Sequence, residues 1–129
     1  MKISFSTLAC PDFSWTDIYT MAKDLGFGGI EISGLGEEIF AVHARPFTDE
    51  RLPKTLDKLR SLGLEIPCLA SGCGLKYKED FDKNISEITQ YIVLAKKLST
   101  PYIRVLGDRY PQPEGEVDDS FVAEALKLL

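Results

Sequence analysis

A charged side chain interrupts the segment PYIRVL (101–106), which otherwise has the composition of a buried β-strand. Arg104 lies there between Ile103 and Val105. Side chains of a strand point alternately to its two faces, so the two apolar neighbours share one face and the guanidinium points to the other. That other face is either exposed to water or part of a polar interior. In a polar interior, the N–H donors of arginine suit a hydroxyl, carboxylate or phosphate group of a ligand.

A carboxylate occupies a similar place in GGIEI (28–32), where Glu31 lies between two isoleucines. A buried charge must be paired, so an interior ion pair between Glu31 and Arg104 is one interpretation, with Ser6 of an earlier strand offering a hydroxyl. A contact between Arg104 and a polar group of a substrate is the other. Both interpretations can hold together, because a paired arginine has further donors to spare.

The remaining candidates for ligand contact lie in loops. His43 is the only histidine and is either a surface residue or a substrate contact, because a metal site needs several convergent ligands. Ser71 follows a predicted strand and is a second candidate, and the segment SGCGLKYK (71–78) offers glycine N–H groups and two lysines for a phosphate. For Asp108 and Arg109, just beyond Arg104, the sequence leaves open whether they contact a ligand. No residue is assigned a catalytic role.

Strand-like and helix-like segments alternate along the chain. Strands are expected at 2–6, 28–32, 64–70 and 101–106, and helices at 14–26, 50–63, 80–99 and 118–129. The first helix opens with a capping box formed by Ser14 and Asp17, and the second helix has leucines at helical spacing and Pro53 near its first turn. Such alternation predicts a parallel sheet with helices outside it.

The connections between these elements differ in length at the two ends of the predicted strands. Connections from helix to strand have two or three residues, whereas those from strand to helix, such as SGLGEEIFAVHARPF (33–47), are long. In parallel α/β proteins, ligands bind at the carboxyl ends of the strands. The long loops therefore mark the expected working face.

Composition narrows the class of protein. A chain of 129 residues with 44% hydrophobic residues suits one domain (1–129) with its own core. The net charge of -5 argues against nucleic acid as a partner. The three cysteines lack CxxC spacing and predict a reducing, cytoplasmic location. The sequence has neither a signal-peptide core nor an apolar run of ~18 residues, so no membrane partner is expected.

Four stretches carry a resemblance to a known family: ISFSTLACPDFSW (3–15), AKDLGFGGIEI (22–32), LRSLGLEI (59–66) and YIVLAKKLSTPYIRVLGD (91–108). GFGGIEI (26–32) and AKKLSTPYIRVLG (95–107) are their most specific parts. Together the four stretches resemble the N-terminal half of the sugar phosphate isomerase/epimerase family, the xylose isomerase-like (β/α)8 TIM barrels. The resemblance spans essentially the whole chain. It implies four βα units with parallel strands, which make half of a barrel.

The resemblance also implies an isomerase or epimerase that acts on a sugar or sugar phosphate by metal-assisted proton transfer next to a carbonyl. The divalent metal (Mn, Mg, Co or Zn) would be held at the ends of strands five to eight, which this chain lacks. We therefore expect no metal ligand, no bound metal and no activity in the isolated chain. We expect it to supply part of the substrate pocket through Arg104, Glu31, His43, Ser71 and Ser6.

Two other functions remain open at this stage. An apurinic-site endonuclease shares the barrel and the metal, but it needs histidines near Ser71 and Gly107. A noncatalytic sugar-binding half-barrel is the second. The end ALKLL (125–129) carries no helix stop signal, and the outer strands of half a barrel have bare edges. We expect either a chain truncated before a missing C-terminal half or a homo-oligomer.

Overall fold

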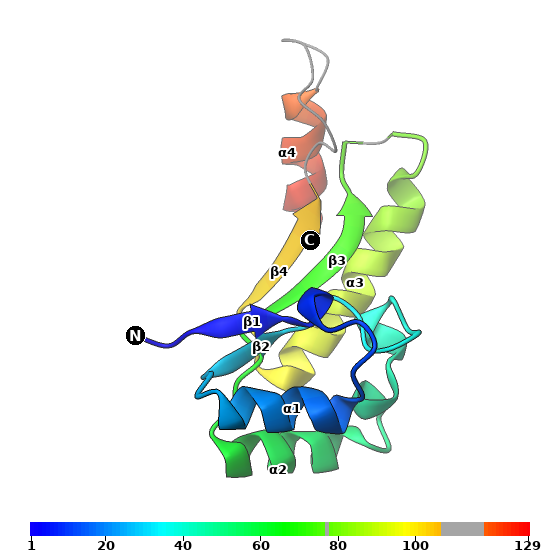
Figure 1. Cartoon of the computed structure of the whole chain (residues 1–129). Coiled ribbons are helices and arrows are strands. Elements are labelled where there is room, and N and C mark those ends of the chain that lie inside the picture. Colours follow the sequence, from blue (N-terminus) through cyan, green and yellow to red (C-terminus); the bar gives the residue numbers. More distant parts are fainter. Residues whose placement is uncertain (77, 107–117) are drawn as a thin grey trace.

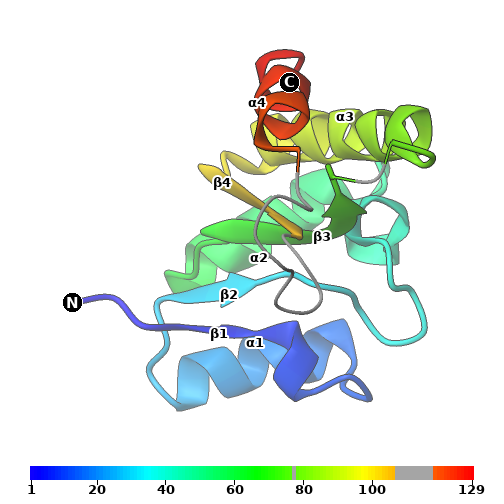
Figure 2. The same cartoon turned by 90° about the horizontal axis from the view of Figure 1, so that it is seen from above.

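Parallel strands in chain order form the frame of the molecule. The computed structural model describes residues 1–76, 78–106 and 118–129, and Asp108 and Arg109 lie outside this part. Its strands are β1 (Ser4–Ser6), β2 (Gly29–Glu31), β3 (Cys68–Gly74) and β4 (Tyr102–Leu106). β1 pairs with β2 and β3 with β4, both in parallel, and the parallel bridges Gly29–Glu65 and Ile32–Leu69 join the two pairs. Figure 2 shows the strands following one another from β1 to β4, as the sequence predicted.

Capping side chains, Ser14 and Asp118, mark the start of the first and the last α-helix in the described part of the chain. The helices are α1 (Trp15–Asp24), α2 (Leu52–Leu62), α3 (Phe81–Leu98) and α4 (Asp119–Lys127), with short 3₁₀ helices η1 (Thr7–Ala9), η2 (Ala41–His43) and η3 (Arg45–Phe47) between them. The Ser14 hydroxyl accepts the N–H of Asp17, and the Asp17 carboxylate accepts the N–H of Ser14, so the predicted capping box is confirmed. Pro53 lies in the first turn of α2, also as predicted.

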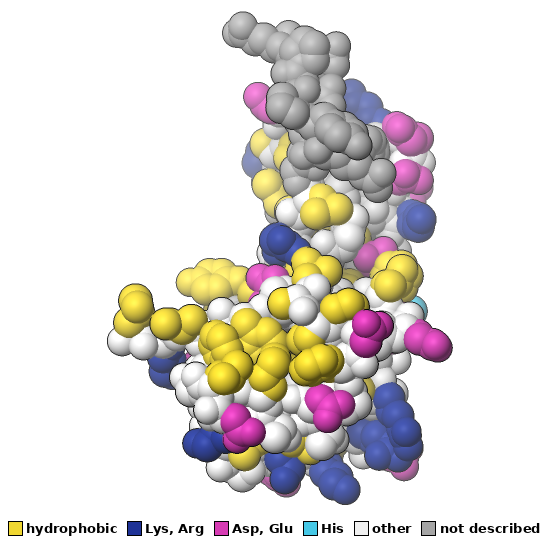
Figure 3. Space-filling view, viewed as in Figure 1, with side chains coloured by type: hydrophobic (Ala, Val, Ile, Leu, Met, Phe, Trp, Pro, Cys, Tyr) yellow, Lys and Arg dark blue, Asp and Glu magenta, His cyan; other side chains and the backbone are white. Residues whose placement is uncertain are grey.

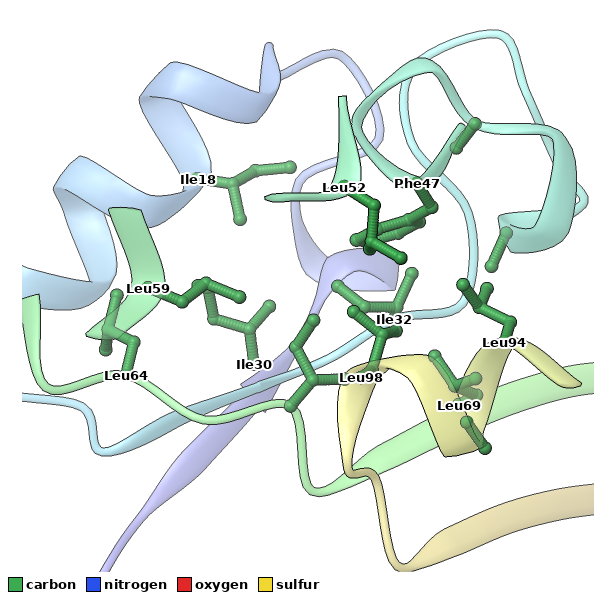
Figure 4. Packing of buried hydrophobic residues seen from close by; sticks show 14 of the residues in the cluster. Ile18, Ile30, Ile32, Phe47, Leu52, Leu59, Leu64, Leu69, Leu94 and Leu98 are labelled. Atoms are coloured by element: carbon green, nitrogen blue, oxygen red, sulfur yellow. The ribbon is translucent and has the colours of Figure 1, made fainter. Parts of the chain in front are cut away.

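One apolar core lies between the strands and the first three helices. In Figure 1, α1 and α2 lie below β1 and β2, and α3 runs along β3. Figure 4 shows this core: Ile18, Ile30, Ile32, Phe47, Leu52, Leu59, Leu64, Leu69, Leu94 and Leu98 all point into it. Along β4, Ile103 and Val105 are half-buried on the helix side, whereas Arg104 and its alternating neighbours are exposed. The predicted division of the strand faces is therefore confirmed, and the Arg104 face is open.

The third strand differs from its prediction at both ends. It begins at Cys68 rather than residue 64, since Pro67 has no N–H to give to a ladder. It continues to Gly74, through residues expected to form a loop. Ala70 pairs with Arg104 and Gly74 with Leu106, so extra residues bulge out of β3 opposite Val105. Bulges of this kind re-aim side chains and are frequent next to active sites.

Gly29 is the position in β2 at which a larger residue does not fit. A Cβ there would lie 2.6 Å from Ser4 Oγ, 3.0 Å from Pro67 Cδ and 3.1 Å from the carbonyl oxygen of Glu65. We expect Gly29→Ala to lower the free energy of unfolding by ~1–3 kcal/mol, the usual cost of overpacking, in urea denaturation. Gly72→Ala is the matched control, because its Cβ would meet nothing within 4 Å. Equal stability of the two variants would contradict the close approach of the strands.

A small second cluster attaches α4 to the rest of the chain. Phe81 and Phe121 lie with their ring centroids 5.2 Å apart. Lys78 Nζ donates to the Asp118 carboxylate at 2.8 Å and lies 5.0 Å from the Phe121 ring centroid. Lys78, predicted as a phosphate ligand, is thus engaged with α4.

The docking of α4 is expected to depend on pH. Lys78, the Ser120 hydroxyl and the Phe121 N–H all donate to Asp118 and hold the pKa of its carboxyl well below the ordinary 3.8. A lowered pKa means that the stabilisation is complete above the unfolded-state pKa and is lost as the pH falls below it. The protection factors of the α4 amides, which compare exchange with the intrinsic rate at the same pH, should therefore fall between pH 6 and pH 3, an interval that spans the carboxyl pKa of ~3.9. Asp118→Asn should reduce this change and Glu124→Gln should not; an equal change in both variants would contradict it.

Candidate functional site

A cavity of about 610 Å³ opens at the carboxyl ends of all four strands. Its wall includes Thr7 just after β1, Ser33 just after β2, Ser71 and Gly74 in β3, and Arg104 in β4. This is the end from which the long loops leave, so the working face predicted from loop lengths coincides with a cavity. Its volume falls within the range of ~300–1,000 Å³ that is usual for small-molecule sites.

Polar groups tie the ends of the strands together around this cavity. The Thr7 hydroxyl, 2% exposed, accepts the N–H groups of Ser33 at 3.0 Å and Gly34 at 3.4 Å. On the other side, Ser71 Oγ donates to the carbonyl oxygen of Arg104 at 2.8 Å. Both hydroxyls are used structurally and fix the backbone of their neighbours. Ser71 thus lines the cavity as predicted, and it also positions the strand that carries Arg104.

The predicted ion pair between Glu31 and Arg104 is wrong. Among the described residues, which include both partners, no carboxylate lies within 4.0 Å of the guanidinium of Arg104. The register explains why. Ile32 pairs with Leu69, which places Glu31 beside Cys68, and Cys68 in turn pairs with Tyr102, two residues before Arg104. The two charges are therefore two strands apart, or ~9.6 Å, and are also offset along the strands.

Cys68 lies between these two charges. Burial raises the pKa of its thiol, the Glu31 carboxylate raises it further, and Arg104 lowers it. The thiol is therefore close to both residues on the open face of the strands. Because Arg104 has no carboxylate partner within the described part of the chain, its donors remain available to an anionic ligand.

Three of the predicted contact residues belong to the described part of the chain but do not line this cavity. Ser6 caps η1, where its hydroxyl accepts the N–H of Leu8 at 3.4 Å. His43 is exposed in η2 with its ring centroid 6.0 Å from that of Phe40. Glu31 is half-buried below the cavity, beside Cys68. Their roles as substrate contacts stay predictions.

Sequence reasoning missed the part of the wall contributed by α3. Lys83, Asn84 and Glu87 lie on the cavity side of its first two turns. Asn84 Nδ2 donates to the Gly74 carbonyl oxygen at 3.0 Å. One carboxylate oxygen of Glu87 is buried with no hydrogen-bond partner. The polar residues at spacings of three and four, between the apolar positions of segment 80–99, were the available signal.

Cys73 in β3 is buried and is held as a neutral thiol. Burial, and then the neighbouring Glu87 carboxylate, raise its pKa to about 12. At pH 8 its thiolate fraction should be about 10⁻⁴, since only the thiolate reacts and each pH unit changes its fraction tenfold. We expect iodoacetamide at pH 8 to alkylate Cys73 far more slowly in the folded than in the urea-unfolded protein, as measured by peptide mass spectrometry. Equal rates would show that the thiol is accessible and ionised.

The described residues do not fit a metal ion. No three His, Cys, Asp or Glu side chains converge among residues 1–76, 78–106 and 118–129. His43, Glu37 and Glu38 share the loop after β2, but Glu38 is engaged by the N–H of Phe40 and His43 lies against Phe40. Within the described part of the chain, no helix is both long enough and apolar enough to cross a bilayer.

The sequence matches no family model and no curated protein at significant similarity. Solved structures do match its fold. The probable 3-DHS dehydratase AsbF of Bacillus anthracis, involved in petrobactin synthesis, is 25% identical with a TM-score of 0.72; the alignment covers 99% of this chain and 46% of AsbF.

Two further solved structures show the same fold. A xylose isomerase domain protein from Planctomyces limnophilus is 17% identical with a TM-score of 0.65, over 96% of this chain and 46% of its own. A xylose isomerase-like TIM barrel fused to a 4-hydroxyphenylpyruvate dioxygenase is 16% identical with a TM-score of 0.63, over 99% of this chain and 20% of its own. The chain therefore spans about half the length of AsbF and of the P. limnophilus protein. The predicted resemblance and fold class are confirmed.

Proposed function

We propose that this chain, which has the fold of about half a xylose isomerase-like TIM barrel, forms the substrate-binding half of an enzyme for a small polyhydroxylated carbonyl compound. A sugar or sugar phosphate is the leading substrate class. The reaction is an isomerisation or epimerisation that begins with removal of a proton next to the carbonyl. The cysteines, all free thiols, agree with a cytoplasmic location for this enzyme.

The observation that carries the proposal is the position of Arg104. It lies at the carboxyl-end cavity, where parallel α/β enzymes place their chemistry, and its side chain has no carboxylate partner in the described part of the chain. A guanidinium in this place binds a phosphate, carboxylate or enolate oxygen through parallel N–H donors. On the opposite wall, the half-buried carboxylate of Glu87 and the side-chain amide of Asn84 add groups that suit hydroxyls of the substrate.

A divalent metal ion is proposed only for the complete barrel. The described residues offer no convergent ligands, so no chemical step is assigned to a metal through this chain. The contribution of the chain is to bind and orient the substrate. Arg104 holds an anionic oxygen, and the Thr7 and Ser71 hydrogen bonds keep the strand ends rigid around it.

Dehydration is the second candidate reaction, because AsbF, at 25% identity, is described as a probable 3-DHS dehydratase. Loss of water next to a carbonyl also begins with proton removal from the neighbouring carbon. The same half-site can therefore serve either reaction, with the fate of the hydroxyl set by the other half of the barrel.

Proton NMR in D₂O tests both reactions on one set of substrates. The complete protein is incubated with divalent metal, a panel of aldoses, ketoses and their phosphates, and 3-DHS. Isomerisation or epimerisation places deuterium on the carbon next to the carbonyl, whereas dehydration removes water and creates an alkene. We expect the first outcome with a sugar or sugar phosphate. Turnover of 3-DHS alone would show that the reaction is a dehydration. Neither exchange nor turnover of any compound would refute the enzyme.

A further inference from the structure

We propose that a second cavity, between the beginnings of α1 and α2, binds a small organic phosphate that carries an aromatic ring. The cavity has a volume of about 680 Å³ and is lined by residues between Phe13 and Lys58. It shares only Gly36 and Glu38 with the cavity at the strand ends, as far as the described residues show. Because this site does not use the strand edges, it does not depend on closure of the barrel.

Positive charge dominates the wall of this second cavity. Its cations are Arg45, Arg51, Lys54 and Lys58. Within the described ranges, no carboxylate lies within 4.0 Å of any of them. The wall also carries Glu37 and Glu38, and Glu38 accepts the N–H of Phe40 at 3.0 Å. Four positive and two negative residues leave a formal charge of +2, in a protein whose net charge is -5.

Three of these cations lie close together at the start of α2 and repel one another. Arg51 precedes α2, and Lys54 and Lys58 follow it at spacings of three and four residues, so they lie on the same side of the helix. Like charges one turn apart destabilise a helix, and a bound anion relieves that repulsion. Figure 3 shows Lys and Arg side chains gathered at the lower right of the molecule, around the end at which α2 begins. This arrangement favours a ligand with more than one negative charge.

Aromatic side chains form the other part of the wall. Phe13 is 41% exposed, and Trp15 is held edge-on against Tyr19 and Phe47 at centroid distances of 5.7 Å each. Lys58 Nζ lies 5.9 Å from the centroid of the Tyr19 ring, so a cation and an aromatic face adjoin each other. A ligand whose aromatic ring stacks on Phe13 places its phosphate groups among the cations. A nucleotide has this combination of groups.

Calorimetric titration of the protein with ADP, inorganic pyrophosphate and adenosine tests the proposal. We expect one ADP bound per chain, with an affinity that falls as salt is added. Arg51→Gln/Lys54→Gln should weaken ADP binding at least about tenfold, because two charge-assisted contacts are lost. Phe13→Ala should weaken ADP binding and leave pyrophosphate binding unchanged. Lys96→Gln/Lys127→Gln removes the same charge elsewhere and should have no effect.

Several results would overturn the proposal. They are no heat with ADP at about 1 mM, an equal loss of affinity in the two double variants, or pyrophosphate binding as tight as that of ADP. Circular dichroism of each variant shows whether it is folded, and a variant that unfolds is replaced by Lys54→Gln alone, for which several-fold weaker ADP binding is expected. Arg104→Met should leave ADP binding intact, so the failure of one site is distinguishable from the failure of the other.

Discussion

Replacing Arg104 by Met should weaken substrate binding in the complete protein by about 10- to 150-fold, because a hydrogen bond to a charged group contributes ~1.5–3 kcal/mol. Its stability should change by less than ~0.5 kcal/mol, since the side chain is exposed and makes no ion pair within the described part of the chain. The separation of these two effects follows from the open face of β4. Steady-state kinetics and urea denaturation measure them side by side.

Arg60→Met is the matched control for this substitution. Arg60 is an exposed arginine on α2 that pairs with Asp57 one turn earlier, at 3.0 Å, and it lines neither cavity. It should leave both kinetics and stability nearly unchanged. If Arg104→Met destabilises the protein by ~3–5 kcal/mol, the residue is instead half of a buried pair, and the open-face account of β4 is wrong.

The chain of 129 residues, studied by itself, should associate rather than remain a monomer. β1 and β4 each pair on one side only within the described residues, and exposed apolar side chains accompany them. Ile3 is 55% exposed, Tyr102 70% and Leu106 38%. On the face of the molecule that Figure 3 shows, hydrophobic side chains are gathered over β1. Unpaired strand edges with apolar surface bind other strands, and in a complete barrel these edges would be closed.

Sedimentation velocity at increasing concentration measures this association. We expect the average mass to rise with concentration, and the variant with Ile3→Lys and Tyr102→Lys to shift toward the monomer, because charges on an edge prevent pairing. Leu25→Lys is the control, since Leu25 is 67% exposed but is the C-cap residue of α1 and belongs to no strand. A monodisperse monomer at every concentration would contradict the proposal that this surface is normally covered.

The sequence predicted elements that depend on local patterns. The Ser14–Asp17 capping box and the turn at Gly63, whose φ is +68°, set the ends of helices directly. The alternation around Arg104 placed Ile103 and Val105 toward the helices correctly. These features involve residues only a few positions apart, so periodicity and capping rules determine them.

Features that depend on register between distant segments were not predictable in the same way. The distance between Glu31 and Arg104 depends on how β2, β3 and β4 are staggered, and a pattern within one strand carries no information about stagger. The bulge in β3 could not be told from a loop, because Gly72 and Gly74 suit both. Glu87 was missed because the apolar spacing of its helix indicates only which side faces the core, and not that a polar side lines a cavity.

The most direct test of the central claim is a titration of the complete protein, labelled with ¹⁵N-glycine, with a substrate found in the D₂O experiment. Gly34, Gly72 and Gly74 line the cavity at the strand ends, whereas Gly26, Gly28 and Gly63 belong to the connections at the opposite ends of the strands. We predict amide shifts at the first group and none at the second. Shifts confined to Gly26, Gly28 and Gly63 would place the substrate at the wrong end of the barrel and contradict the account.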